Sequence, residues 1–286
     1  MGGGTYCYKS RSGRATTDGY ATKSTHEVFS STRLDPDMNP AGIRFRESRD
    51  SAEHPNSVPI VIGLDVTGSM GYVPHELIKD GLPTMVSRLM KSGIADPQIL
   101  FNGIGDHYTD RSPLQVGQFE SSDELIDKWL LKCYLEGGGG GNGGESYLLS
   151  WYLAAKHTSI DSLEKRGQKG FLFTLGDDKN HRELDYGSLA RLMGPGEYKD
   201  YTAAELLGLA SEKYHVFHIN IADNWQGRDS STKNDWRELL GDNSLTVNNH
   251  QEIPLLIANT IANIVRGTQD TVDVSTDEEE PRKHLL

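Results

Sequence analysis

The sequence predicts an α/β protein built on a doubly wound, mostly parallel central sheet with helices on both faces. Three observations support this fold class. Apolar, β-branched runs alternate with stretches of helical periodicity through the middle of the chain. The first of these runs, residues 58–65, is almost continuously apolar, as expected of a parallel strand that is covered on both faces. The length of 286 residues is enough to bury such a sheet, and with only two cysteines the chain has neither a disulfide framework nor a four-cysteine zinc site.

About six strands are expected, with one short antiparallel strand at an edge. In chain order they are predicted over residues 58–65, 98–106, 114–119, 170–177, 214–222 and 245–248. The third is short and alternates in polarity. Because strands and helices alternate throughout, the connections should be right-handed crossovers and the sheet should be open.

Helices are predicted between these strands. They are expected over residues 75–91, 121–135 and 145–157, from 202 onward, and over the closing segment 253–264. The second and the fourth begin with a capping box, in which a Ser or Thr is followed three residues later by Glu. Pro83 should kink or shorten the first helix.

Composition divides the chain into three segments. Residues 1–57 are rich in Gly, Ser, Thr, Arg and Asp without a sustained period, so we expect an extended arm with little regular structure, ordered only where it packs on the next segment. Residues 58–266 form the predicted domain. Residues 267–286 form an acidic tail that is expected to be flexible.

Charge and hydropathy exclude several classes of protein. The net charge of -12 argues against an electrostatically driven nucleic-acid binder. No apolar run is long enough to span a membrane. The N-terminal residues lack the apolar core of a signal peptide, and Tyr6 stands where a myristoylation signal has Ser or Thr. We therefore expect a cytoplasmic protein that makes no membrane contact.

Acidic residues end four of the predicted strands: Asp65, Asp106, the pair Asp177 and Asp178, and Asp223. In a doubly wound sheet, ligands bind beyond the carboxyl ends of the strands. Carboxylates gathered there repel one another and usually need a cation or a proton. The alternative is that each aspartate only caps the helix that follows it.

The most specific motif is Asp65-Val-Thr-Gly-Ser69, directly after the first strand. It directs one carboxylate and the hydroxyls of Thr67 and Ser69 into a small space. Carboxylate and hydroxyl oxygens are hard ligands that suit Mg²⁺. Because the hydroxyls are neutral, the ion would keep most of its charge and could accept a carboxylate from another molecule.

With this loop the sequence resembles the von Willebrand factor A (vWA) domain family and its metal-ion-dependent adhesion site (MIDAS), in an intracellular branch of prokaryotic or phage type. The resemblance covers roughly residues 58–266 and implies a Rossmann-like fold. It implies that Asp65, Thr67 and Ser69 form the first metal loop and that Asp177 is the third-loop ligand, with Asp178 as a near substitute. The implied ion is Mg²⁺, with Mn²⁺ or Ca²⁺ as alternatives.

The second metal loop departs from the family pattern, in which a threonine stands just before a helix. Residues 136–146 read Glu-Gly-Gly-Gly-Gly-Gly-Asn-Gly-Gly-Glu-Ser, which places Asn142 at the threonine position. Asn142, Ser146 or a water molecule are the alternatives for this ligand, and Asp106, Ser146 and Asp178 are candidates for the outer layer around the ion. As a phosphate-binding loop the glycine run lacks the required lysine and does not follow a strand, so a flexible metal loop is the better interpretation.

Two further pairs of residues stand out, but neither is predicted to be a site. His107 and His181 lie near predicted strand ends with aspartates close by, which suggests zinc, but the sequence shows no ligand-spaced cluster and favours surface or hydrogen-bonding roles. Tyr147 and Trp151 share one face of a predicted helix and are expected to pack in the core.

The vWA resemblance implies a non-enzymatic module that captures an exposed Asp or Glu of a partner protein through the metal. Intracellular relatives often act as adaptors for AAA+ ATPases, which makes such an ATPase a candidate partner by analogy. The alternative function is a Mg²⁺-dependent haloacid-dehalogenase-like phosphohydrolase with Asp65 as nucleophile, although Thr67 replaces its usual general acid. The acidic run 277–280 is a candidate internal competitor for the metal.

Overall fold

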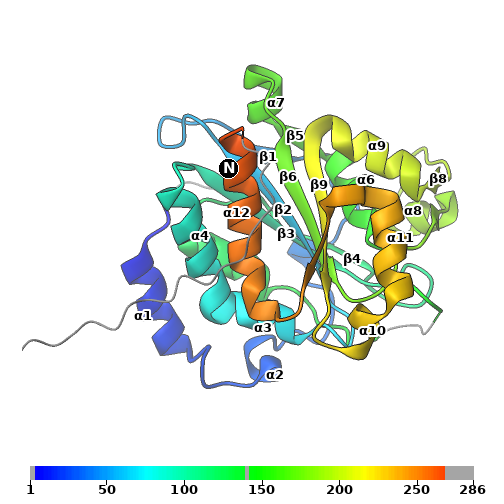
Figure 1. Ribbon diagram of the computed structural model, residues 1–286, viewed down its shortest axis with the longest axis horizontal. Coiled ribbons are helices and arrows are strands. Elements are labelled where there is room, and N and C mark those ends of the chain that lie inside the picture. The colour runs from blue at the N-terminus through cyan, green and yellow to red at the C-terminus, as the bar shows by residue number, and fades with distance from the viewer. Residues whose placement is uncertain (1–3, 139–141, 268–286) are drawn as a thin grey trace, which may run out of the picture.

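The computed structural model describes residues 4–138 and 142–267, and its centre is a six-stranded sheet (Figure 1). The strand order is β10-β9-β6-β2-β3-β4. In chain order these strands are β2 (Val58–Asp65), β3 (Pro97–Ile104), β4 (Leu114–Val116), β6 (Gly170–Gly176), β9 (Tyr214–Ile221) and β10 (Ser244–Val247). All neighbours are parallel except β4, which runs antiparallel to β3 at one edge. The predicted α/β fold class, with its mostly parallel, Rossmann-like sheet, is therefore confirmed.

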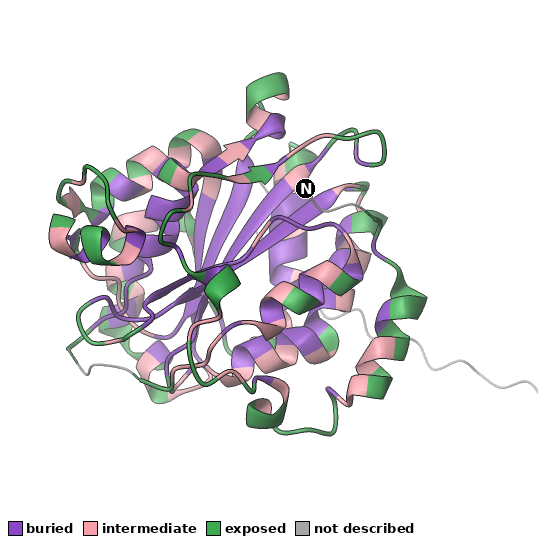
Figure 2. Cartoon of the chain, turned by 180° about the vertical axis from the view of Figure 1, so that it is seen from behind, coloured by how far each residue is buried: buried purple, intermediate pink, exposed green. Residues whose placement is uncertain are grey.

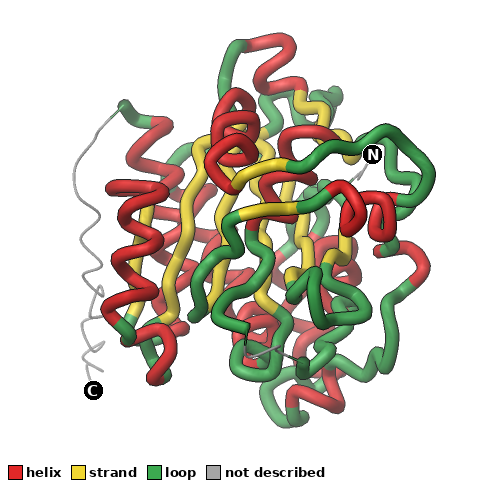
Figure 3. Tube along the Cα trace, turned by 90° about the vertical axis from the view of Figure 1, so that its right-hand side faces the viewer, coloured by secondary structure: helices red, strands yellow, loops and turns green. Residues whose placement is uncertain are grey.

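Helices cover both faces of the sheet, and the strands between them are buried (Figures 2 and 3). One face is covered by α3 (Tyr72–Glu76), the π-helical segment η2 (Leu77–Gly81), α4 (Leu82–Lys91), α5 (Asp123–Leu131) and α12 (Ile253–Val265). The other is covered by α6 (Leu148–His157), α8 (Tyr186–Met193), α9 (Ala203–Lys213) and α11 (Ser230–Leu240). Each face has its own apolar cluster, as expected where a parallel sheet is covered twice. None of the helices in the described ranges is both long and apolar enough to cross a membrane.

Smaller elements join or flank this framework. They are α1 (Tyr8–Asp18), α2 (Thr25–Val28), η1 (Pro36–Met38), β1 (Arg46–Ser48), β5 (Thr158–Ile160), α7 (Asp161–Arg166), β7 (Glu183–Leu184), β8 (Tyr201–Thr202), α10 (Trp225–Arg228), η3 (Gly241–Asn243) and η4 (His250–Glu252). Two of them, β1 and β5, pair in parallel, and β7 pairs with β8 in antiparallel.

Residues 1–57 hold more regular structure than the sequence predicts. Helix α1 runs for 11 residues, and Arg11 is its one buried residue. The Arg11 Nε lies 2.9 Å from Asp127 Oδ2 on α5, and Arg14 Nη2 lies 2.8 Å from a carboxylate oxygen of both Asp123 and Asp127. This helix is held by ion pairs rather than by an apolar stripe, which is why hydrophobic periodicity does not reveal it. Apart from Gly267, the predicted tail 267–286, with its acidic run, lies outside the described residues.

Several predicted helix boundaries shift in the structure. The Ser122 side chain, not that of Ser121, caps α5, which ends at Leu131 rather than at residue 135. The helix predicted over 75–91 is interrupted by the π-helical segment η2, which lies directly before α4 with Pro83 in its first turn, as expected where a proline removes a backbone donor. The capping box that starts α9 is confirmed, with reciprocal bonds between Thr202 and Glu205.

Candidate metal centre

The carboxyl ends of the parallel strands bring the acidic residues to one edge of the sheet. Asp65 is the last residue of β2, and Asp106, Asp177 and Asp223 follow β3, β6 and β9 by one or two residues. Strand β2 pairs with β3 on one side and with β6 on the other. Asp65 therefore lies between the loops that carry Asp106 and Asp177.

The first loop folds back on Asp65 and meets the third loop. Asp65 Oδ1 accepts hydrogen bonds from the Thr67 backbone N–H at 2.9 Å and from Thr67 Oγ1 at 2.6 Å. Ser69 Oγ donates to Asp177 Oδ1 at 3.2 Å. Asp65, Thr67 and Asp177 are buried and Ser69 is half-buried. Four of the predicted ligands thus form one group of oxygen atoms.

Two side chains that the sequence did not assign to the site orient its carboxylates. Tyr147 Oη donates to Asp65 Oδ2 at 2.7 Å, and Asn224 Nδ2 donates to Asp177 Oδ2 at 2.6 Å. Tyr147 packs in the core as predicted, but its hydroxyl belongs to the site. Asn224 also caps α10 through its Oδ1. Its place after β9, next to Asp223, was the available signal in the sequence.

The electrostatics of this group favour a cation. Burial raises the pKa of Asp65, and the charge of Asp177 raises it further. Burial also raises the pKa of Glu145, and the charges of Asp65 and Asp106 add to this effect. Glu145 Oε2 is buried without a hydrogen-bond partner among the described residues. Buried carboxylates, two hydroxyls and an unpartnered carboxylate oxygen are a donor set that fits Mg²⁺.

The glycine run contacts the loop that follows β2. The Gly68 N–H donates to the Gly138 carbonyl oxygen at 2.9 Å. A Cβ on Gly68 would lie 3.0 Å from the Gly137 carbonyl oxygen, so the close approach of the two backbones favours glycine. Residues 139–141 lie outside the described residues.

The predicted residues of the second loop contact a neighbouring group instead of Asp65 and Asp177. Asn142 Nδ2 donates to Asp106 Oδ2 at 2.6 Å, and Ser146 Oγ lies 2.6 Å from His107 Nδ1. Within the described ranges, neither Asn142 nor Ser146 makes a hydrogen bond to the first group. Which residue of this loop would complete the carboxylate site therefore stays a prediction.

The remaining acids at this edge have other partners. Asp178 Oδ1 accepts from the Lys179 N–H at 2.7 Å, and its carbonyl oxygen accepts from Trp236 Nε1 at 2.9 Å. Asp223 accepts a hydrogen bond from Tyr72 Oη at 2.6 Å and lies 2.7 Å from His250 Nδ1. The charge of Asp223 is thus compensated locally, whereas the charge of Asp177 acts on the buried Asp65.

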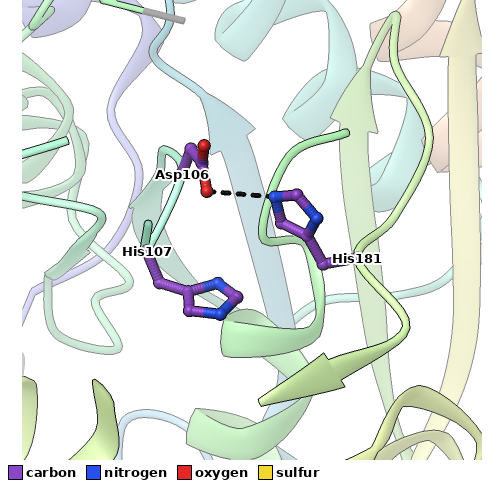
Figure 4. Close-up of side chains that lie close together, drawn as sticks. All are labelled: Asp106, His107 and His181. Atoms are coloured by element: carbon purple, nitrogen blue, oxygen red, sulfur yellow. Dashed lines mark hydrogen bonds and ion pairs between the residues drawn. The ribbon is translucent and has the colours of Figure 1, made fainter. Parts of the chain in front are cut away.

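Beside the carboxylate group, Asp106, His107 and His181 lie close together (Figure 4). Asp106 Oδ1 is 3.0 Å from His181 Nε2. The sequence predicts surface or hydrogen-bonding roles for both histidines. His107 is buried and His181 is half-buried, and each makes a side-chain hydrogen bond, His107 with Ser146 and His181 with Asp106. The segment that carries His181 is held by backbone bonds to Glu145, from Glu145 N to the Lys179 carbonyl at 2.8 Å and from His181 N to the Glu145 carbonyl at 3.0 Å.

Solved structures that resemble this chain include three that are only distantly similar in sequence. No family model matches the chain, and no curated protein matches it. A pilus adhesin, SpaC from Lactobacillus rhamnosus GG, is 12% identical with a TM-score of 0.49, over 76% of this chain and 31% of the adhesin. Proximal thread matrix protein 1 from the mussel byssus is 12% identical with a TM-score of 0.43, over 72% of this chain and 48% of that protein. The conserved hypothetical protein BatB from Bacteroides thetaiotaomicron is 12% identical with a TM-score of 0.42, over 73% of this chain and 99% of that one.

This chain thus spans about a third of the adhesin and about half of the matrix protein that it resembles. Likeness at these identities and TM-scores identifies neither a family nor an activity for it.

Proposed function

We propose that this chain is a metal-dependent protein-binding module. Asp65, Thr67, Ser69 and Asp177 would hold Mg²⁺ or Mn²⁺, and an Asp or Glu side chain of a partner protein would complete the coordination. The observation that carries this proposal is the hydrogen bond from Ser69 Oγ to Asp177 Oδ1, at 3.2 Å, which joins the first and third loops of the vWA-like pattern.

The chemistry of the donor set supports capture of a carboxylate rather than hydrolysis. Of the four side chains, two are neutral hydroxyls and two are carboxylates, so a bound divalent ion would be neutralised less than in a site made of carboxylates alone and could accept an acidic partner. In the phosphohydrolase alternative Thr67 would have to act as the general acid. Its hydroxyl instead donates to Asp65 at 2.6 Å, and an alcohol is a far weaker acid than a carboxylic acid.

Isothermal titration with Mg²⁺ or Mn²⁺ tests the ligand assignment. The metal-free chain should bind one ion, and Asp65→Ala should abolish the binding signal. Asp242→Ala is the matched control, because Asp242 is an exposed acid in η3, far along the chain from the proposed loops. Unchanged binding in Asp65→Ala would overturn the assignment.

The partner class needs a second experiment. Peptides with a central Asp or Glu should be retained by the immobilised chain in Mg²⁺ and released by a chelator, while matched Asn or Gln peptides should not be retained. A phosphatase assay run beside it separates the two functions, since metal-dependent turnover that Asp65→Asn removes would favour the hydrolase. An AAA+ ATPase partner and a cytoplasmic location stay predictions from the sequence.

A further inference from the structure

A second cluster of metal-ligating side chains lies beside the carboxylate group. One ligand atom each from Asp106, His107 and His181 lies within 4.8 Å of the other two (Figure 4). Across residues 4–138 and 142–267 this is the one group of three or more His, Cys, Asp or Glu side chains gathered so closely. Capture of a carboxylate by Mg²⁺ does not need two imidazoles, so the cluster requires an explanation of its own.

His107 is buried beside the other two residues, and within the described ranges one of its ring nitrogens lacks a partner. Its side chain is 1% exposed, and its Nε2 is buried without a hydrogen-bond partner among the described residues. A buried polar atom without a partner is costly and needs a reason.

Asp106 and His181 already have the spacing of two ligands on one ion. Asp106 Oδ1 and His181 Nε2 are 3.0 Å apart, close to the value of about 3.3 Å for two ligands of tetrahedral Zn²⁺. Asp106 is fixed by hydrogen bonds from the Tyr108 N–H, Thr109 Oγ1 and Asn142 Nδ2, at 3.0, 2.9 and 2.6 Å. Outer partners of this kind orient the first ligands of a metal site.

We propose that Asp106, His107 and His181 form a second metal site, which takes a transition metal of the Zn²⁺ class. Two imidazoles and one carboxylate suit Zn²⁺, whereas Mg²⁺ and Ca²⁺ prefer oxygen ligands alone. Three protein ligands leave a fourth position for water. The site does not use Asp65 or Asp177 and is therefore independent of the proposed protein-binding function.

An ion at this position would also order the second loop. Asn142 contacts Asp106, and Ser146 contacts His107, so both ends of the segment 142–146 are attached to the proposed ligands. The same segment holds Glu145, which bonds through its backbone to Lys179 and His181. Zn²⁺ would thus fix the loop that lies next to the carboxylate group.

Titration of the metal-free full chain with Zn²⁺, in the presence of saturating Mg²⁺, tests the site. We expect one Zn²⁺ per chain, and more than about tenfold weaker binding in His181→Gln and in His107→Gln. Co²⁺ should give the visible absorption of a four-coordinate ion in the wild-type chain but not in these variants. His181 is only half-buried, so its replacement tests the site even if the buried His107 variant does not fold.

Two control variants give the result its meaning. His26→Gln changes an exposed histidine of α2 and should leave Zn²⁺ binding unchanged. Asp65→Ala should also leave it unchanged, even if it abolishes Mg²⁺ binding, so failure of the carboxylate site and failure of the histidine site can be told apart. Zn²⁺ binding that persists in His181→Gln, or that is lost in Asp65→Ala alone, would overturn the proposal, as would the absence of binding by the wild-type chain.

Discussion

At the scale of single residues, Tyr147 shows how a core side chain can also serve the site. It is fully buried at the start of α6, and its hydroxyl reaches Asp65 Oδ2. Gly176, the last residue of β6, makes room for it, because a Cβ on Gly176 would lie 1.9 Å from Tyr147 Oη. Because Gly176 ends β6 without a side chain, the Tyr147 hydroxyl can reach Asp65 at the end of the neighbouring strand β2 and orient its carboxylate.

Tyr147→Phe should therefore weaken Mg²⁺ binding without unfolding the chain. The substitution removes the donor to Asp65 Oδ2 but keeps the ring in its packed position. Loss of a partner that orients a metal ligand typically lowers metal affinity by about 10–100-fold, which isothermal titration would measure. Tyr152→Phe on the same helix, whose hydroxyl contacts His157 at 3.4 Å, is the control and should bind normally. Equal affinities in the two variants would show that the Tyr147 hydroxyl does not act on the metal.

At the scale of elements, Asp161 attaches the N-terminal arm to the domain. Asp161 Oδ1 accepts from Arg49 at 2.8 Å, and Oδ2 accepts from the Asp50 N–H at 2.9 Å and from Lys165 at 2.6 Å. These bonds lie next to the short pairing of β1 with β5. Burial alone would raise the pKa of Asp161, but the bonds from Lys165, Asp50 and Arg49 outweigh it and lower the pKa to about 2.

Asp161→Asn should consequently cost stability in a pH-dependent way. Because the folded pKa lies below the unfolded value of about 3.9, the carboxylate stabilises the fold above that pH, and the effect is lost as the pH falls toward about 2. Allowing for solvent screening, we expect the variant to be about 1–2 kcal/mol less stable in urea unfolding at pH 7, with a smaller difference at pH 3. Glu164→Gln, which changes a more exposed acid that also contacts Arg49, should have less effect. A difference that does not depend on pH would contradict this account.

At the scale of the whole molecule, the sheet was predictable because its four central strands, β9, β6, β2 and β3, are largely apolar runs of seven or eight residues. Helices α8 and α11 were not predicted; α11 buries only Thr232 and Trp236, so its apolar pattern is weak. The loops proposed as the first and third metal loops could be placed together because parallel strands end at one edge of the sheet. The grouping of His107 with His181 could not be predicted from the sequence. It depends on the path of the glycine run and on the backbone bonds of Glu145, which leave no pattern in the sequence.

The same edge also affects the stability of the whole fold. The charge of Asp177 raises the pKa of the buried Asp65, and the charge of Asp65 raises the pKa of the buried Glu145, so repulsion among these acids should destabilise the metal-free chain. Mg²⁺ at about 100 times its Kd should add about 2.7 kcal/mol, which for a chain of this size raises Tm by about 5 °C.

Asp65→Asn keeps the shape of the side chain but removes one of these charges. In a chelator its Tm should lie at or above that of the wild-type chain, and it should not respond to Mg²⁺, whereas Asp242→Asn should respond as the wild-type chain does. Thermal unfolding followed by circular dichroism, with and without Mg²⁺, measures both effects. If metal-free Asp65→Asn instead melts well below the wild-type chain, the Asp65 carboxylate stabilises the metal-free fold, which would contradict the prediction that its charge destabilises it.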